Sequence, residues 1–291
     1  MIIDEKQDFE SLITRLPDYF LVQNFSETSG LKEIPDFTQG PLEENAENAR
    51  KFLVDNFETL LAVKIKELRR LVKIVDLAGE WLPYKLKFPL TDLKNIAKMN
   101  SKSFPVSEFT GSSKTKVSGT FHVYEILDEI YVIAAEFKSR SALLRKTYRY
   151  LILAKEGILL AEALKGTKEI LEKLLLPKLG LSSDNIKERN VNAMIVKKVA
   201  RKFIPQRLTF LISIETAGVD GLTSISLEGD NVKRGLETLK SRQEFDLDPS
   251  NLGPWTAVET ETVNVAVRKP VRVKRSQRYL ELVQTLIVAF S

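Results

Sequence analysis

The chain has 291 residues, of which 43% are hydrophobic, a composition that supports packed cores and excludes intrinsic disorder. It contains no cysteine, which excludes disulfide bonds, zinc sites built from thiolates and cysteine nucleophiles. The formal net charge of +5 is uneven, because residues 1–60 carry 13 acidic and 5 basic side chains, so the excess of basic residues lies beyond them.

The first hundred residues predict a helical region with an acidic N-terminal arm. Residues 4–16 form an amphipathic pattern that ends at Pro17. Residues 42–78 hold the longest helical pattern, either one helix of roughly 50 Å or two helices in an antiparallel hairpin. A helix of that length can pair between chains, so we expect either a protein partner or a homo-oligomer there as an alternative to packing within the chain. Residues 81–84 are interpreted as a bend.

A Ser-, Lys- and Gly-rich stretch over residues 101–118 predicts a linker between residues 1–100 and a domain over residues 119–291. This second domain divides further into candidate subdomains at 119–180 and 191–291. Apolar runs separated by turn residues predict a β-meander at its start, with strands at 120–127, 130–138, 143–153 and 158–163. The continuous apolar run of residues 130–135 predicts a central strand that is covered on both faces.

The rest of the chain alternates short helical and strand patterns. We expect helices at 167–176, with Thr167 as a possible N-cap, and at 191–202. Strands are predicted at 208–214, 223–227, 258–268 and 271–274, and the β-branched content of residues 279–290 favours a last strand. Because strands are grouped with strands, the order predicts an α+β fold in which a helical N-terminal region is followed by mainly antiparallel sheets with packed helices.

Basic side chains gather in three groups along the second domain. We interpret them as candidate contacts to nucleic-acid phosphates, because Arg and Lys neutralise phosphates without reading the bases. The meander contributes Lys138, Arg140, Arg145, Lys146 and Arg149, a helix contributes Lys197, Lys198, Arg201 and Lys202, and the C-terminal hairpin contributes Arg268, Lys269, Arg272, Lys274, Arg275 and Arg278.

Catalytic chemistry has little support in the sequence. His122 is the one histidine and lies in a predicted strand, where a packed side chain is the usual role, and no metal site or cofactor is expected. The favoured hypothesis is a non-enzymatic binding or assembly protein with a basic surface that contacts DNA or RNA without strong sequence specificity. An alternative is a structural subunit of a larger protein complex. The N-terminus lacks a signal-peptide pattern and no run is long enough to cross a membrane, so we expect a cytoplasmic protein with no membrane partner.

Glu136 and Lys138 supply an enzymatic alternative. A strand that ends in Glu-x-Lys resembles the signature of the PD-(D/E)xK nucleases, in which carboxylates hold Mg²⁺ and the lysine positions the attacking water. The resemblance implies a metal-dependent nuclease with Glu136 as a metal ligand and Lys138 beside it. The family's aspartate on the preceding strand has no clear counterpart here, where Glu125 and Asp128 are the nearest acids, and a strand is predicted where the family has a helix.

Overall fold

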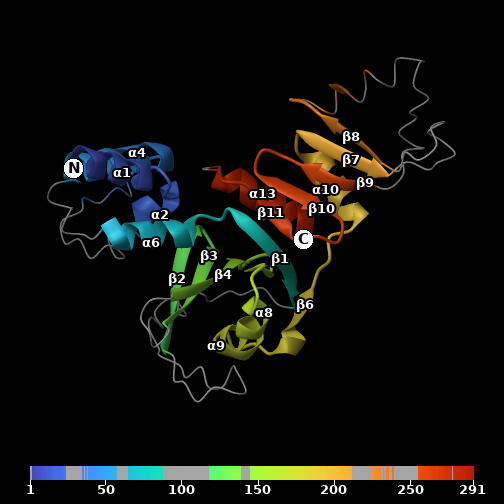
Figure 1. Ribbon diagram of the computed structural model, residues 1–291, viewed down its shortest axis with the longest axis horizontal. Coiled ribbons are helices and arrows are strands. Elements are labelled where there is room, and N and C mark those ends of the chain that lie inside the picture. Colours follow the sequence, from blue (N-terminus) through green and yellow to red (C-terminus); the bar gives the residue numbers. More distant parts are fainter. Residues whose placement is uncertain are drawn as a thin grey trace. The chain divides into compact units, whose positions relative to one another are not determined.

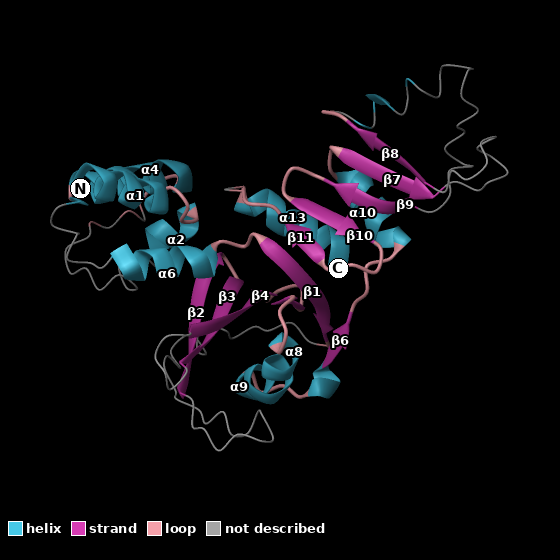
Figure 2. Cartoon of the chain, in the orientation of Figure 1, coloured by secondary structure: helices cyan, strands magenta, loops and turns pink. Residues whose placement is uncertain are grey.

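The computed structural model describes residues 2–23, 35, 37, 39–57, 65–87, 118–138, 145–211, 224–230, 232, 234–235, 238, 255–276 and 278–291. The chain forms two compact units, the first made of Met1–Leu77 and Phe88–Asn185 and the second of Ala78–Lys87 and Ile186–Ser291. Helices come first along the chain and antiparallel strands follow, so the predicted α+β class is confirmed (Figures 1 and 2). None of the described helices combines the length and apolar character that crossing a membrane requires.

The N-terminal helices belong to the same unit as the meander. They are α1 (Ile2–Ile13), α2 (Asp18–Gln23), α4 (Leu42–Asp55) and α6 (Ile65–Val75). The sequence left one or two helices open for residues 42–78. Here α4 ends at Asp55, because the backbone leaves helical geometry at Asn56 (φ −100°, ψ 19°), and α6 covers Ile65–Val75; residues 58–64 lie outside the described residues. The unit therefore runs across the predicted boundary at 101–118, of which residues 101–117 lie outside the described residues.

The meander forms as the sequence predicts. Its strands β2 (Ser118–Leu127), β3 (Ile130–Lys138), β4 (Arg145–Leu153) and β5 (Ile158–Glu162) pair antiparallel in chain order. Residues 130–135 are at most 7% exposed, which confirms a central strand covered on both faces.

Neighbouring residues of β4 show which helices cover the two faces. Side chains of successive strand residues point to opposite faces. Arg149 contacts the end of α6, whereas Tyr150 donates a hydrogen bond to the carbonyl of Thr167 (2.9 Å). Thr167 begins a helical segment made of α8 (Thr167–Ile170), the π-helical turn η2 (Leu171–Leu175) and α9 (Leu176–Lys178), followed by the 3-10 turn η3 (Ser183–Asn185). The segment's N-cap is Gly166 (φ 94°), so Thr167 is not the cap.

The second unit is built on a sheet in which the strands β1-β11-β10-β9-β7-β8 follow in that order, and β6 pairs with the last part of β1. Helices α10 (Ala193–Lys202) and α13 (Tyr279–Phe290) pack on one another, and α10 also packs on β9 (Figure 1). The strands are β1 (Gly79–Leu86), β6 (Ile186–Glu188), β7 (Arg207–Leu211), β8 (Ser224–Glu228), β9 (Trp255–Glu259), β10 (Val263–Ala266) and β11 (Val271–Val273).

The predicted bend at 81–84 is wrong, since these residues lie within β1. Proline is unusual inside a strand because it has no N–H to donate. Here the first part of β1, through Trp81, pairs with β11, and its last part, from Tyr84, pairs with β6. Pro83 stands between the two paired parts, and its carbonyl accepts the N–H of Arg189 (2.9 Å). A change of partner at this position explains why the proline is tolerated.

Residues 258–268 form a hairpin, not one strand as predicted. The hydroxyl of Thr260 accepts the backbone N–H groups of Thr262 (3.3 Å) and Val263 (3.1 Å), and its own N–H donates to the carbonyl of Val263 (2.8 Å). A threonine hydroxyl that bonds its own backbone nearby favours a turn. Strand propensity concealed the turn, because two of its three residues, Thr260 and Thr262, are threonines, which favour strands.

The predicted last strand at 279–290 is also wrong, because these residues form α13. Tyr279, Leu282, Val283, Leu286 and Phe290 are buried at helical spacing. β-Propensity mainly reflects how a side chain packs on a sheet, so β-branched residues are equally accommodated on the buried face of a helix. The pattern is a buried helical stripe.

Candidate functional site

Arg149 is a structural residue of the first unit. Its Nη1 donates to the carbonyl of Lys73 (3.0 Å) and to that of Asp76, and its Nε and Nη2 donate to the carboxylate of Glu162 (3.0 and 2.6 Å). A guanidinium next to the last carbonyls of a helix compensates its unpaired acceptors and its dipole. The side chain is buried and joins β4 to α6, so this candidate contact is engaged within the protein.

Glu136 also has partners within the protein. Arg70 of α6 donates to its carboxylate through Nε (2.9 Å) and Nη2 (2.5 Å). The Nε2 of His122 lies 3.2 Å from the same carboxylate and 2.7 Å from Nη2 of Arg70. Burial opposes ionisation of Glu136, but hydrogen bonds from His122 and Arg70 and the charge of Arg70 outweigh it and lower its pKa to about 2. The result is an ionised carboxylate surrounded by protein donors.

The acids nearest in sequence to Glu136 lie far along the ladder. Glu136 is opposite Thr120 of β2, five residues before Glu125 in that strand, which is about 17 Å at the rise of an antiparallel strand. Glu125 accepts the N–H of Glu129, and Asp128 pairs with Lys155. Within the described ranges no three histidine or acidic side chains are grouped so that they could hold a metal ion.

The remaining basic residues of the meander contribute one described cation to its surface. Lys146 is exposed on β4. Arg140 lies outside the described residues, and the structure describes the backbone but not the side chains of Lys138 and Arg145. For the candidate pair Glu136 and Lys138, the structure therefore describes the backbone of both residues but the side-chain contacts of Glu136 alone.

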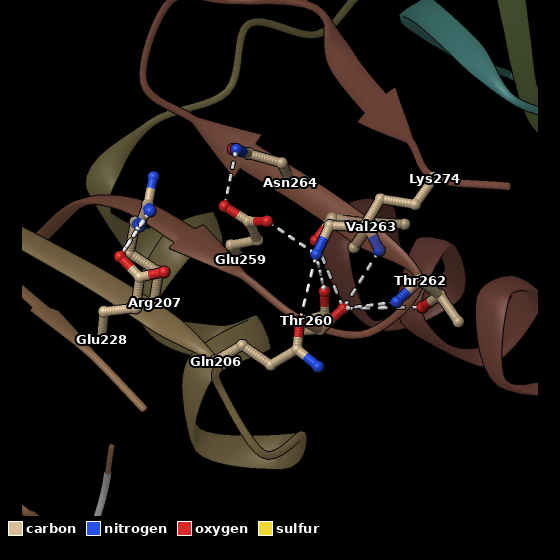
Figure 3. A network of polar contacts seen from close by, with 9 residues as sticks. All are labelled: Gln206, Arg207, Glu228, Glu259, Thr260, Thr262, Val263, Asn264 and Lys274. Carbon is tan, nitrogen blue, oxygen red and sulfur yellow. Dashed lines mark hydrogen bonds and ion pairs between the residues drawn. The ribbon is translucent and has the colours of Figure 1, made fainter. Parts of the chain in front are cut away.

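Two cations of the C-terminal group are engaged in ion pairs. Lys274 pairs with Glu259 (2.6 Å) and donates to the carbonyl of Thr260 (2.7 Å) and to Gln206 (3.1 Å), as Figure 3 shows. Arg278 pairs with Glu261 (2.6 Å). These contacts hold the β9–β10 turn and the residues after β11 together, so both side chains have a structural role.

Arg272 and Arg275 are exposed, and Arg272 lies in a row of mixed charge. It is opposite Glu80 of β1 and Asn264 of β10 in the sheet register. The row continues through Glu259 and Arg207, and Arg207 pairs with Glu228 (2.5 Å; Figure 3). Alternating carboxylates make this row a poor surface for a polyanion.

Helix α10 has a different character. Asn192 caps its first turn by accepting the N–H of Ile195 (3.0 Å), and Ile195, Val196, Val199 and Ala200 are buried. The opposite side carries four exposed cations, and the helix contains no acidic residue. We call these cations the basic helix face: Lys197, Lys198, Arg201 and Lys202.

The turn between β10 and β11 lies beside the start of this helix. Its residues Arg268 and Lys269 are exposed. The backbone N–H of Arg268 donates to the carbonyl of Val191 (2.9 Å), one residue before the cap of α10. The structure thus connects part of the C-terminal group with the helical group, within a single unit.

No known protein family matches the sequence, and no curated protein is significantly similar to it. Function is therefore inferred from the chemistry of the site itself.

Sequence reasoning missed the partners that neutralise several candidate residues. Arg70, the main partner of Glu136, is 66 residues away in the chain, and Lys73, whose carbonyl accepts from Arg149, is 76 residues away. Because the partners are so far apart in the chain, no local sequence pattern predicts either contact. The link between Val191 and Arg268 likewise depends on tertiary structure. The sequence placed Arg268 in a strand that ended at Lys269-Pro270, whereas β10 ends at Ala266 and Arg268 lies in the turn that follows.

Proposed function

We propose that this protein binds nucleic acid through the basic helix face of α10, with contacts mainly to phosphates and without strong sequence specificity. The observation that carries the proposal is the set of four exposed cations on a helix that has no carboxylate of its own. Such a surface attracts phosphates and gains affinity by releasing their counterions.

The helix dipole does not account for the whole cluster. Cations in the last turn of a helix are favoured by its dipole, which explains Arg201 and Lys202. Lys197 and Lys198 precede that turn, where the dipole effect is small. Lys197 makes no hydrogen bond or ion pair with the part of the chain that the structure describes, and Lys198 makes one long contact, to the carbonyl of Ser291 (3.3 Å).

Salt dependence of binding tests the proposal. For single strands, each phosphate contact contributes about 0.7 to the slope of log K against log salt concentration. The double variant Lys197→Gln/Lys202→Gln should therefore reduce the slope by about 1.4 for a fluorescein-labelled 12-nucleotide DNA of mixed sequence. Fluorescence anisotropy from 50 to 300 mM KCl measures the slope.

Lys51→Gln/Lys178→Gln is the matched control, because these are also two exposed helical lysines. It should retain the wild-type slope. The proposal is refuted if the wild-type protein shows no salt-dependent binding, or if the control pair lowers the slope as much as the α10 pair. Equal affinity for several unrelated sequences is expected, and strong preference for one would contradict phosphate-based recognition.

A further inference from the structure

Arg268 occupies a backbone conformation that disfavours its own side chain. The N–H of Lys269 donates to the carbonyl of Ala266 (3.2 Å), so residues 266–269 form a tight turn in which Arg268 is third. Its φ is 58°, in the left-handed region. A positive φ at the third position of a turn favours glycine or asparagine, since a Cβ is crowded there.

No contact of the Arg268 side chain with the described residues offsets the cost of this backbone conformation. The guanidinium of Arg268 is exposed and makes no hydrogen bond or ion pair with any described residue. Its backbone N–H is bonded to Val191, but glycine would supply the same N–H. Residues held in unfavourable backbone regions are enriched at functional sites, and here only the side chain distinguishes arginine from the glycine that the turn prefers.

The turn lies at one end of the basic helix face. The backbone N–H of Arg268 is bonded to Val191, two residues before α10 begins at Ala193, and the helix continues to Lys202. At 1.5 Å per residue, the distance along the helix axis from Ala193 to Arg201 is about 12 Å. Each strand of double-helical DNA carries a phosphate about every 3.4 Å along the axis, so this length corresponds to about three to four phosphate spacings.

We propose that Arg268 is a second phosphate-binding point of the same site, placed at one end of a basic strip that continues along α10. The inference rests on the proposed function. The planar guanidinium can donate two parallel hydrogen bonds to one phosphate, which lysine cannot do. Lys269 lies next to it and is also exposed.

Arg268→Gly separates binding from folding, because the substitution suits the turn but removes the guanidinium. We expect its melting temperature to be unchanged or raised by up to about 2 °C. Its affinity for the labelled 12-nucleotide DNA should fall about fivefold at 0.1 M salt, the effect of one lost contact with a slope of about 0.7. Arg268→Lys should lose less, since it keeps the charge. For a labelled trinucleotide, which cannot span the strip, Arg268→Gly and wild type should differ by less than twofold.

Glu129→Gly is the control for the backbone effect. Glu129 is the other described non-glycine residue with positive φ (61°), and it lies in the first unit. Its glycine variant should likewise keep or raise the melting temperature but leave DNA affinity within twofold of wild type.

Three outcomes would overturn the inference. One is a loss of more than about 2 °C in melting temperature with unchanged affinity for Arg268→Gly, which would make Arg268 structural. Another is wild-type affinity in Arg268→Gly while the Lys197→Gln/Lys202→Gln variant is impaired, which would leave the proposed function intact. The last is wild-type binding in both variants, which would remove the proposed function as well.

Discussion

Glu136→Gln should destabilise the first unit at neutral pH and much less in acid. The folded protein lowers the pKa of Glu136 from 4.5 to about 2, because hydrogen bonds from His122 and Arg70 outweigh the effect of burial. At about 1.4 kcal/mol per pKa unit, the ionised carboxylate contributes about 3 kcal/mol to the free energy of unfolding. A lowered pKa means that this contribution is complete above pH 4.5 and is lost as the pH falls through 2. Glutamine keeps the shape of the side chain but not its charge.

Urea unfolding from pH 3 to pH 7, followed by far-ultraviolet circular dichroism, measures the difference between wild type and variant. Both tryptophans, Trp81 and Trp255, belong to the second unit, so their fluorescence reports on that unit in the same samples. The difference seen by circular dichroism should be largest near pH 7 and shrink towards pH 3. If the difference in unfolding free energy stays constant across this range, or if the variant is as stable as wild type at pH 7, the ionised carboxylate of Glu136 does not contribute the expected stability.

Other substitutions test the remaining structural roles. Arg149→Met should destabilise the first unit by about 3 kcal/mol, because it leaves the carboxylate of Glu162 (15% exposed) without its guanidinium. Urea unfolding measures this loss, and an unchanged unfolding midpoint would contradict the structural role of Arg149. Lys274→Met should lower the stability of the second unit by about 1 kcal/mol, which tryptophan fluorescence measures during unfolding. The salt slope of DNA binding should stay unchanged, and a reduced slope would instead make Lys274 a phosphate contact. Burial and the charges of Glu125, Asp128 and Glu129 raise the pKa of Tyr19 to about 12, so stability should decline as the pH rises from 10 through 12. Tyr19→Phe should reduce that decline, and an identical alkaline profile would refute the assignment.

Local patterns were sufficient wherever one periodicity dominated. The run of residues 130–135 predicted a doubly covered strand because every residue is apolar, and the buried stripe of α10 was visible in Ile195, Val196 and Val199. The pattern failed where two periods were compatible with the same residues. In α13, apolar residues are so dense that alternation and helical spacing both fit, and β-branched content then favoured the wrong answer.

The candidate site was predictable as a set of charges but not as a surface. Sequence gives the position of every cation, yet whether it is exposed depends on partners elsewhere in the chain. Arg149 and Lys274 are engaged by Glu162 and Glu259, whereas the four cations of α10 remain exposed because their helix buries its other side. Tertiary contacts therefore decide which basic residues can meet a ligand.

The contact between Arg149 and the end of α6 has a consequence for how the first unit folds. The strands of the meander pair with their neighbours in sequence, so they can form early at little entropic cost. The hydrogen bond from Arg149 to Asp76 instead closes a loop of 73 residues, which has a larger entropic cost, so we expect this contact to form late in folding. Substituting Arg149 should then leave the refolding rate nearly unchanged and accelerate unfolding. The contacts of Arg149 would then slow the detachment of α6 from a sheet that has already formed.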